Sequence, residues 1–292
     1  MESEAVMKIH NNQIEVEFTT KGGEMTSLTS KKTGVQYLWQ GSDAYWTGKN
    51  PTLFPMVGNT FSGTYEIDGK EYQMKNHGLI RYADLECVNQ SDTSITFQLK
   101  ADEATKKQYP FDFMYEITYT LNDGVVEVSY VIRNEGKKTM PFGFGLHPGF
   151  NCPILEGEHF EDYRIDFETE EHLQQLISDP KRETPHHYEE RTISSIPMDY
   201  TTFDTYPTLI YKGMKSSYVT LTGPKHSVKM SIKGYPILAV WTYATGAPFV
   251  CIEPWYSHGD FEKNDLPFEK REGTMLLEPG KEFTTSYTIE VF

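Results

Sequence analysis

The sequence predicts an all-β protein, a large antiparallel β-sandwich with few short helices. Apolar and polar residues alternate along several segments, as they do in half-buried strands. Turn signals, not long amphipathic patterns, separate these segments. Aromatic residues make up 14% of the chain, with 19 Tyr and 17 Phe, and such residues favour extended structure. The strands are too many for a small immunoglobulin-type domain, so we expect residues 1–292 to form a single domain.

The alternation is regular enough to place individual strands and two hairpins. Residues 122–124 (Asn-Asp-Gly) join two predicted strands, and we expect Gly124 to supply the positive φ of that turn. Asp68 and Gly69 are expected to form the turn of a second hairpin over residues 65–72. The predicted strands cover residues 14–18, 95–99, 115–121, 126–132 and 283–292.

Two short helical segments are also expected. Residues 101–109 begin with Asp102 as a cap and stop at Pro110. Residues 170–178 are expected to form the other short helix. The surrounding stretch, residues 156–204, is polar and interrupted by prolines, so we expect irregular excursions there, forming a lid or a rim.

Charge and cysteine content exclude several classes of protein. The formal net charge of −15 would repel a phosphate backbone, so we expect no nucleic-acid partner. Cys87, Cys152 and Cys251 are far apart and form no CxxC pair, which indicates neither a disulfide framework nor a zinc knuckle. No apolar run has the length of a membrane span, and the N-terminus lacks a signal-peptide core. We therefore expect a cytoplasmic protein with no membrane partner.

Three short stretches combine ionisable residues with glycine, proline and aromatic residues. Their candidates are His77, His147 and Glu253. Each has a structural explanation: His77 can belong to a turn, His147 can bond to backbone, and Glu253 can pair with Arg81. The stretches are KNHGLIRYADLE, FGFGLHPGFNCPI and APFVCIEPWYSHGD, at residues 75–86, 142–154 and 247–260.

Taken together, these candidates indicate acid/base chemistry. Glu253 follows an apolar run, and burying an unpaired carboxylate is costly unless it has a partner or a role. A buried glutamate and a positioned histidine such as His147 can exchange protons near neutral pH. The chain has no P-loop, no complete dinucleotide fingerprint and no G-x-S-x-G elbow. We therefore expect chemistry in which only protons move, with no cofactor and no metal.

At these stretches the sequence resembles the aldose 1-epimerase (galactose mutarotase-like) family, and it is most similar to the LacX-like bacterial branch. The likeness covers essentially the whole chain and includes PTLFPMVGN, HGLIRYADLE, GLHPGFNCPI and FVCIEPWYSHGD. HPGFNCP followed by CIEPWY is fairly specific. The resemblance implies a β-sandwich of the super-sandwich type. It also implies cofactor-independent interconversion of the α and β anomers of a free hexose such as galactose or glucose.

The resemblance also implies roles for individual residues. Glu253 would be the catalytic base that takes the proton of the anomeric hydroxyl. His147 would be the acid that protonates the ring oxygen, and His77 would assist on that side. Arg81 would bind sugar hydroxyls. The residues expected to face the apolar side of a pyranose are Trp241, Phe150, Trp255 and Tyr256.

One departure from the family pattern concerns Asn59. Relatives usually carry arginine after FPMVG, where it binds sugar hydroxyls or a sugar phosphate. Asn59 is uncharged and shorter, which argues against a phosphosugar. Asp260 is a candidate for the family's substrate-contacting aspartate and, alternatively, for the cap of a turn.

Two other functions remain open from the sequence. A non-catalytic carbohydrate-binding or regulatory module would keep the fold and its cleft without turnover. Hydrolysis or elimination on a larger saccharide is the third option, but glycoside hydrolysis ordinarily needs two facing carboxylates, and only Glu253 qualifies. We expect a small-molecule aldose as partner and a monomer or homodimer. An open cleft at His147 and Glu253 would favour the enzyme, and a buried ion pair away from the cleft would favour the binding module.

Overall fold

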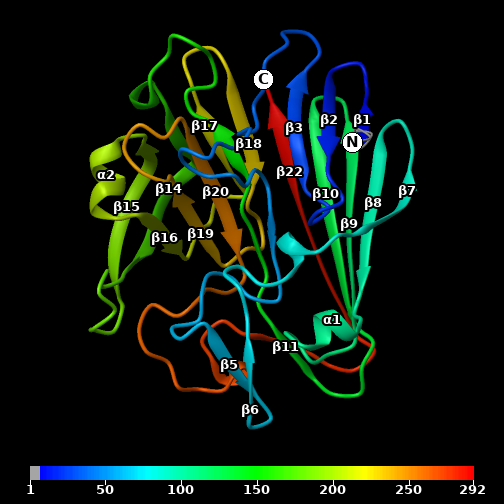
Figure 1. Ribbon diagram of the computed structural model, residues 1–292. Helices are drawn as coiled ribbons and strands as arrows, with labels where there is room; N and C mark the ends of the chain where they lie inside the picture. The colour runs from blue at the N-terminus through cyan, green and yellow to red at the C-terminus, as the bar shows by residue number, and fades with distance from the viewer. Residues whose placement is uncertain (1–6) are drawn as a thin grey trace.

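Antiparallel strands dominate the structure, as the sequence predicts. The computed structural model describes residues 7–292 (Figure 1). Apolar positions of the predicted strands are buried and alternate with more exposed polar positions, as in β2. The strands are β1 (Met7–His10), β2 (Ile14–Phe18), β3 (Met25–Ser30), β4 (Thr52–Leu53), β5 (Thr64–Ile67), β6 (Lys70–Gln73), β7 (Glu86–Gln90), β8 (Ser94–Lys100), β9 (Phe113–Asn122), β10 (Val125–Asn134), β11 (Met140–Phe142), β12 (Gly145–Leu146), β13 (Gly149–Asn151), β14 (Arg164–Ile177), β15 (His187–Pro197), β16 (Thr208–Lys212), β17 (Tyr218–Thr222), β18 (Ser227–Ser231), β19 (Ile237–Trp241), β20 (Phe249–Trp255), β21 (Met275–Leu277) and β22 (Glu282–Val291).

Helical structure is short throughout the described residues. The α-helices are α1 (Glu103–Lys106) and α2 (Tyr200–Thr205), and the 3₁₀ turns are η1 (Ile80–Tyr82), η2 (Phe160–Asp162) and η3 (Phe268–Lys270). Within residues 7–292 no helix has the length and apolar character needed to cross a membrane.

One 15-stranded sheet forms the frame of the sandwich. Its strand order is β4-β12-β20-β19-β16-β14-β17-β18-β22-β10-β9-β8-β7, with β13 on β20 and β15 on β14. Figure 1 shows β8, β9 and β10 on one side of the molecule and β14, β16, β19 and β20 on the other. The pairing of β18 with β22 links the two halves. The smaller sheets are β1-β2-β3, β5-β6 and β11-β21.

Aromatic side chains fill the space between the two halves. Tyr130 of β10 meets Phe144 edge-on at 4.9 Å between ring centroids and stacks on Tyr287 of β22 at 6.3 Å. Each such residue buries about 150–250 Å². The high aromatic content of the sequence therefore serves mainly the core.

Strand β20 separates the main core from the opposite face of its sheet. Val250 and Ile252 belong to the main core. Phe249 and Cys251 belong to a separate cluster, and Trp255 to another. Because side chains alternate along a strand, Glu253 shares the face of these last three residues.

Both predicted hairpins are confirmed, with a correction to one turn. In the β5–β6 turn, Asp68 and Gly69 have φ values of 51° and 76°, as a type I′ turn requires. In the β9–β10 turn the positive φ belongs to Asp123, at 52°, and not to Gly124. Aspartate tolerates the left-handed region because its short side chain bonds locally.

The first predicted helix is present, and the second is wrong. Asp102 caps α1 by accepting the amides of Ala104 and Thr105 at 2.9 and 2.7 Å. Residues 170–178 lie largely in β14, where Leu173 is buried between exposed neighbours. Hydrogen-bonded pairing of β14 with β15, β16 and β17 stabilises the strand over the expected helix.

The expectation of irregular structure across residues 156–204 is also wrong. This stretch contains the two long strands β14 and β15 and the helix α2. Pro180 and Pro185 lie in the connection between the strands, and Pro197 ends β15. The strand β15 pairs only with β14 among the described strands, so its composition is polar like that of a loop.

Candidate active site

Strand β20 places Glu253 opposite His147. The glycine two residues before His147 pairs with Trp255, and the glycine two residues after it pairs with Cys251. His147 and Glu253 therefore occupy facing positions on one face of the sheet. Nε2 of His147 lies 3.3 Å from Oε2 of Glu253.

Close packing explains the glycines on either side of His147. A Cβ on Gly145 would lie 2.6 Å from Cδ1 of Trp255, and a Cβ on Gly149 would lie 2.9 Å from Cζ3 of Trp46. Both indole rings reach the backbone beside His147 only because these positions lack side chains. The imidazole is consequently held between large neighbours.

The His147–Glu253 pair is buried, with His147 5% and Glu253 1% exposed. Burial raises the pKa of Glu253 well above its usual 4.5. Burial, assisted by His77 and Arg81, lowers the pKa of His147 well below its usual 6.5. The neutral forms of both groups are therefore favoured. Transfer of one proton from Glu253 to His147 produces a carboxylate base and an imidazolium acid without any exchange with solvent.

Three polar atoms at this pair lack a hydrogen-bond partner within residues 7–292: Nδ1 of His147, Oε2 of Glu253 and Nε1 of Trp255. The 3.3 Å contact of His147 with Glu253 is close but is not aligned as a hydrogen bond. Each unpartnered buried group costs about 1–3 kcal/mol. A ligand with several hydroxyls would satisfy them, because each hydroxyl both donates and accepts.

His77 joins the pair from a separate segment. Its φ is 65°, and that of Gly78 is 82°. Nδ1 of His77 accepts the amide of Gly58 at 3.1 Å, which leaves the proton of the neutral ring on Nε2. The ring centroids of His77 and His147 are 5.2 Å apart. Burial, with a contribution from Arg81, lowers the pKa of His77 to about 3.

Arg81 supplies positive charge near this group. Its guanidinium lies 5.3 Å from the ring centroid of Tyr82. Its charge contributes to the lowered pKa values of His77 and His147. Among the described residues, Glu253 lies within ion-pair distance of His147 but not of Arg81. The structural explanation of Glu253 as a partner of Arg81 is therefore wrong.

Two tryptophans pack against His147. The indole of Trp46 stacks on His147 at 4.8 Å between ring centroids. Trp241 meets the same imidazole edge-on at 5.4 Å. Trp241 is a residue that the sequence indicates, whereas Trp46 is not. Trp46 lies between β3 and β4 without a motif of its own, and only the fold brings it to His147.

A hollow of about 330 Å³ opens beside the pair. Sites for small molecules have volumes of about 300–1,000 Å³. Four residues indicated by the sequence line the hollow: Asn59, His77, Trp255 and Asp260. His147 and Glu253 do not line it, but His77 and Trp255 connect it to them. The pair is thus buried next to the hollow. This arrangement lies between an open cleft at the pair, expected for the enzyme, and a buried pair away from the cleft, expected for the binding module.

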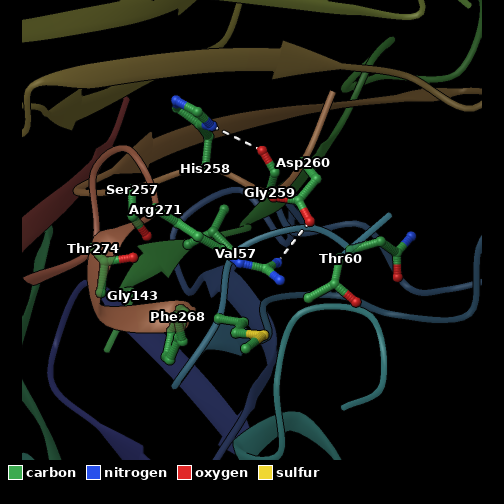
Figure 2. A pocket seen from close by; sticks show the side chains of 12 residues that line it. Val57, Thr60, Gly143, Ser257, His258, Gly259, Asp260, Phe268, Arg271 and Thr274 are labelled. Carbon is green, nitrogen blue, oxygen red and sulfur yellow. Dashed lines mark hydrogen bonds and ion pairs between the residues drawn. The ribbon is translucent and has the colours of Figure 1, made fainter. Parts of the chain in front are cut away.

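Asp260 faces the hollow with its carboxylate already engaged. Oδ2 of Asp260 accepts from Nη1 of Arg271 at 2.6 Å. Figure 2 shows this contact in a second pocket, which Asn59 and Asp260 also line. The same oxygen accepts the amide of Phe61 at 2.9 Å. The amide of Asp260 in turn donates to the carbonyl of Asn59 at 2.9 Å. These contacts hold the loop that follows β20 against the segment that carries Asn59.

Phe150 and Tyr256 are not brought into the group. Phe150 is fully buried in the main core. The Tyr256 hydroxyl hydrogen-bonds to Oγ1 of Thr285 at 2.9 Å, and its ring packs on Phe283 at 5.1 Å. Neither residue lines the hollow. Alternation of side chains along β13 turns Phe150 toward the core. Tyr256, which directly follows β20, packs against the same core.

Cys251 is a further residue at this site that the sequence analysis did not single out. It precedes Glu253 by two positions on β20 and so shares its face. Ligand atoms of His147, Cys251 and Glu253 all lie within 4.8 Å of one another, and all three residues are buried. The period-two pattern of the strand was the signal that could have identified it.

The fold and this group of residues define a class: β-sandwich proteins of the galactose mutarotase type. The chain belongs to the aldose 1-epimerase family, whose family model matches residues 5–290. Protein LacX (chromosomal) of Lactococcus lactis subsp. lactis is 30% identical over 287 residues, covering 93% of this chain and 94% of that protein.

Solved structures agree with this assignment. A galactose mutarotase related enzyme from Lactobacillus acidophilus has a TM-score of 0.90 and 31% identity, over 99% of this chain and 97% of that one. A galactose mutarotase-like protein from Lactobacillus casei has a TM-score of 0.90 and 27% identity, over 99% of this chain and 100% of that one. The resemblance noted from the sequence is confirmed.

Proposed function

We propose that this protein interconverts the α and β anomers of a free hexose such as galactose or glucose. The observation that carries the proposal is the buried His147–Glu253 pair, with its 3.3 Å spacing, beside a hollow of about 330 Å³. Membership of the aldose 1-epimerase family supports the reaction class.

In the proposed mechanism Glu253 and His147 act on one sugar. The carboxylate of Glu253 removes the proton of the O1 hydroxyl while the imidazolium of His147 protonates O5. The C1–O5 bond breaks and the C1–O1 bond becomes a carbonyl. After rotation about C1–C2, O5 attacks the other face of C1. His147 then recovers the proton from O5, and Glu253 returns its proton to O1.

Burial assists the ring-opening step. The two proton transfers convert an ionic pair into protonated Glu253 and neutral His147. These are the forms that burial favours. Ring opening therefore removes charge from a poorly solvated site. The side chains exchange only protons with the sugar, so the C1–O5 bond can break and re-form without a cofactor.

Other residues would bind and orient the sugar. Nε2 of His77, which carries the ring proton, would donate a hydrogen bond on the ring-oxygen side. Arg81 and Asn59 would contact sugar hydroxyls. Trp241 and Trp255 would contact the apolar face of the pyranose. Cys87, Cys152 and Cys251 are all free, and free thiols fit the reducing cytoplasm in which we place the activity.

Anomer exchange tests the proposal directly. Purified protein is added to freshly dissolved α-D-glucose and α-D-galactose, and optical rotation is followed against buffer alone. We expect acceleration by wild type and its loss in Glu253→Gln and His147→Asn. Glu171→Gln is a matched control, because Glu171 is also fully buried but accepts the amides of Lys215 and Ser216 away from the site. No acceleration by folded wild type on either sugar would contradict the proposal for these hexoses.

A non-catalytic carbohydrate-binding module is the second candidate. The burial of His147 and Glu253 favours it, because neither group lines the hollow. Trp46 and Trp241 pack against His147. Tryptophan fluorescence titrated with the same sugars separates the two functions. Saturable binding without anomer exchange would support the module, whereas exchange would exclude it.

A further inference from the structure

His147, Cys251 and Glu253 combine three kinds of metal ligand in one buried place. An imidazole nitrogen, a thiol sulfur and a carboxylate oxygen lie within 4.8 Å of one another. We propose that these three residues form a binding site for Zn²⁺ and that bound Zn²⁺ blocks the sugar chemistry. The blocking effect rests on the proposed function, whereas metal binding does not.

The sheet register brings the ligands together without a special loop. Cys251 and Glu253 point to one face of β20, and His147 faces Glu253 from the neighbouring backbone. Zinc takes sulfur at about 2.3 Å and nitrogen or oxygen at about 2.0–2.2 Å, which puts neighbouring tetrahedral ligands about 3.5 Å apart. The 3.3 Å between His147 and Glu253 already matches this spacing. The sulfur of Cys251 lies within 4.8 Å of both other ligand atoms, and it would move closer to them when the ion binds.

The ligand types select a borderline-soft cation. Thiolate and imidazole suit zinc, whereas magnesium and calcium prefer sets made only of oxygen. Binding expels the thiol proton of Cys251 and the carboxyl proton of Glu253 to solvent. Zn²⁺ with one thiolate, one carboxylate and one neutral imidazole has no net charge. That neutrality suits a site in which isolated charges are costly.

The orphaned Oε2 of Glu253 is the second observation that points to a ligand. Glu253 is 1% exposed, and this oxygen has no hydrogen-bond partner in the described part of the chain. A metal would occupy the lone pairs through which Glu253 and Nε2 of His147 exchange protons. The fourth tetrahedral position would remain for a hydroxyl or water. The bound ion would therefore compete with the sugar reaction.

Two metal probes test the site on the full chain after treatment with a chelator. Zn²⁺ is titrated by calorimetry, and Co²⁺ is titrated for the near-ultraviolet absorption that a cobalt–thiolate bond produces. We expect one bound ion and a thiolate band in wild type. Cys251→Ser should remove the band and weaken Zn²⁺ binding at least about tenfold, since even a hydrogen-bond partner of a ligand contributes about 10–100-fold to metal affinity. Glu253→Gln should weaken binding while keeping the band.

Cys152→Ser is the matched control, because Cys152 is also fully buried but lies in the main core. It should retain wild-type affinity and the band, and thermal melting should verify that every variant is folded. A band that persists in Cys251→Ser, or a wild type that binds neither ion, would overturn the site. Where anomer exchange is active, saturating Zn²⁺ should abolish it in wild type, and full activity at saturation would overturn the blocking effect. Metal binding without any anomer exchange would support the site and count against the proposed function alone.

Discussion

The indole ring of Trp46 stacks on the imidazole ring of His147 with 4.8 Å between centroids and 30° between planes. A cation over an aromatic face gains about 0.5–2 kcal/mol, most when water is excluded. The stack therefore favours the imidazolium form of His147, which burial disfavours. Trp46 thus positions the proposed acid and stabilises its charged state.

Replacing Trp46 by leucine removes this stabilisation. We expect kcat for anomer exchange to fall about tenfold, because about 1.4 kcal/mol corresponds to a factor of ten. Trp46→Phe keeps an aromatic face and should retain most of the rate. Polarimetric rates of both variants check the expectation. Equal rates in Trp46→Leu and wild type would show that the stack has no role in proton transfer.

Glu24 anchors the segment that carries Trp46. Its Oε1 accepts the amides of Lys49 and Asn50 at 2.8 and 2.6 Å. Hydrogen bonds to a charged group contribute about 1.5–3 kcal/mol each. Glu24→Ala should release the segment, lower the melting temperature and change the tryptophan fluorescence. Glu24→Gln keeps an acceptor oxygen and should show smaller changes, and identical behaviour of the two variants would contradict this role of the carboxylate.

The strands with clear alternation were predictable from the sequence because each has one buried face. The strands β14 and β15 were not, since their residues are largely polar and β14 gains its identity from pairing with β15, β16 and β17. Buried and exposed positions alternate along parts of β14, but two of its buried residues, Glu171 and Gln175, are polar. The strand therefore lacks the alternation of apolar and polar residues that marks a strand in a sequence.

The same limit applies to the site. Glu253 and His147 were identifiable because an ionisable residue stood among apolar residues, glycine and proline. Trp46 carries no such contrast and becomes visible only through its contact with His147. The sequence signal for Cys251 is its period-two spacing from Glu253 on β20. Phe150 and Tyr256 were expected to face the sugar from the resemblance alone, and in the structure both pack in or against the main core.

The pH dependence of anomer exchange should reflect reversed pKa values at the pair. Since the pKa of His147 lies below 6.5 and that of Glu253 above 4.5, the pair holds one transferable proton between its two pKa values. At lower pH the pair holds two transferable protons, because His147 becomes an imidazolium while Glu253 stays protonated. No carboxylate then remains to act as the base. At higher pH Glu253 loses the transferable proton, so the acid is lost. We expect a bell-shaped profile in kcat/KM.

An NMR titration of metal-free protein assigns the two limbs of that profile. The imidazole nitrogens of His147 should report a neutral ring through pH 6.5, the usual pKa of histidine. His77, with a pKa of about 3, should also remain neutral there. Protonation of His147 near pH 6.5 would show that the charged pair, not the neutral pair, is the resting state.

Gly78 fixes the backbone that presents His77. Its φ is +82°, and a Cβ there would lie 2.2 Å from the carbonyl oxygen of Phe54. Gly213 is the matched control, because its φ is +89° but nothing lies within 4 Å of its Cβ position. Gly213→Ala should lower the free energy of unfolding by backbone strain alone, about 1–2 kcal/mol. Gly78→Ala adds the collision, about 1–3 kcal/mol more, and should displace His77 and lower the exchange rate of the folded protein. Chemical denaturation measures the free energy of unfolding, and polarimetry measures the rate of anomer exchange. Equal losses of stability and of rate in the two variants would show that the contact with Phe54 does not hold His77 in place.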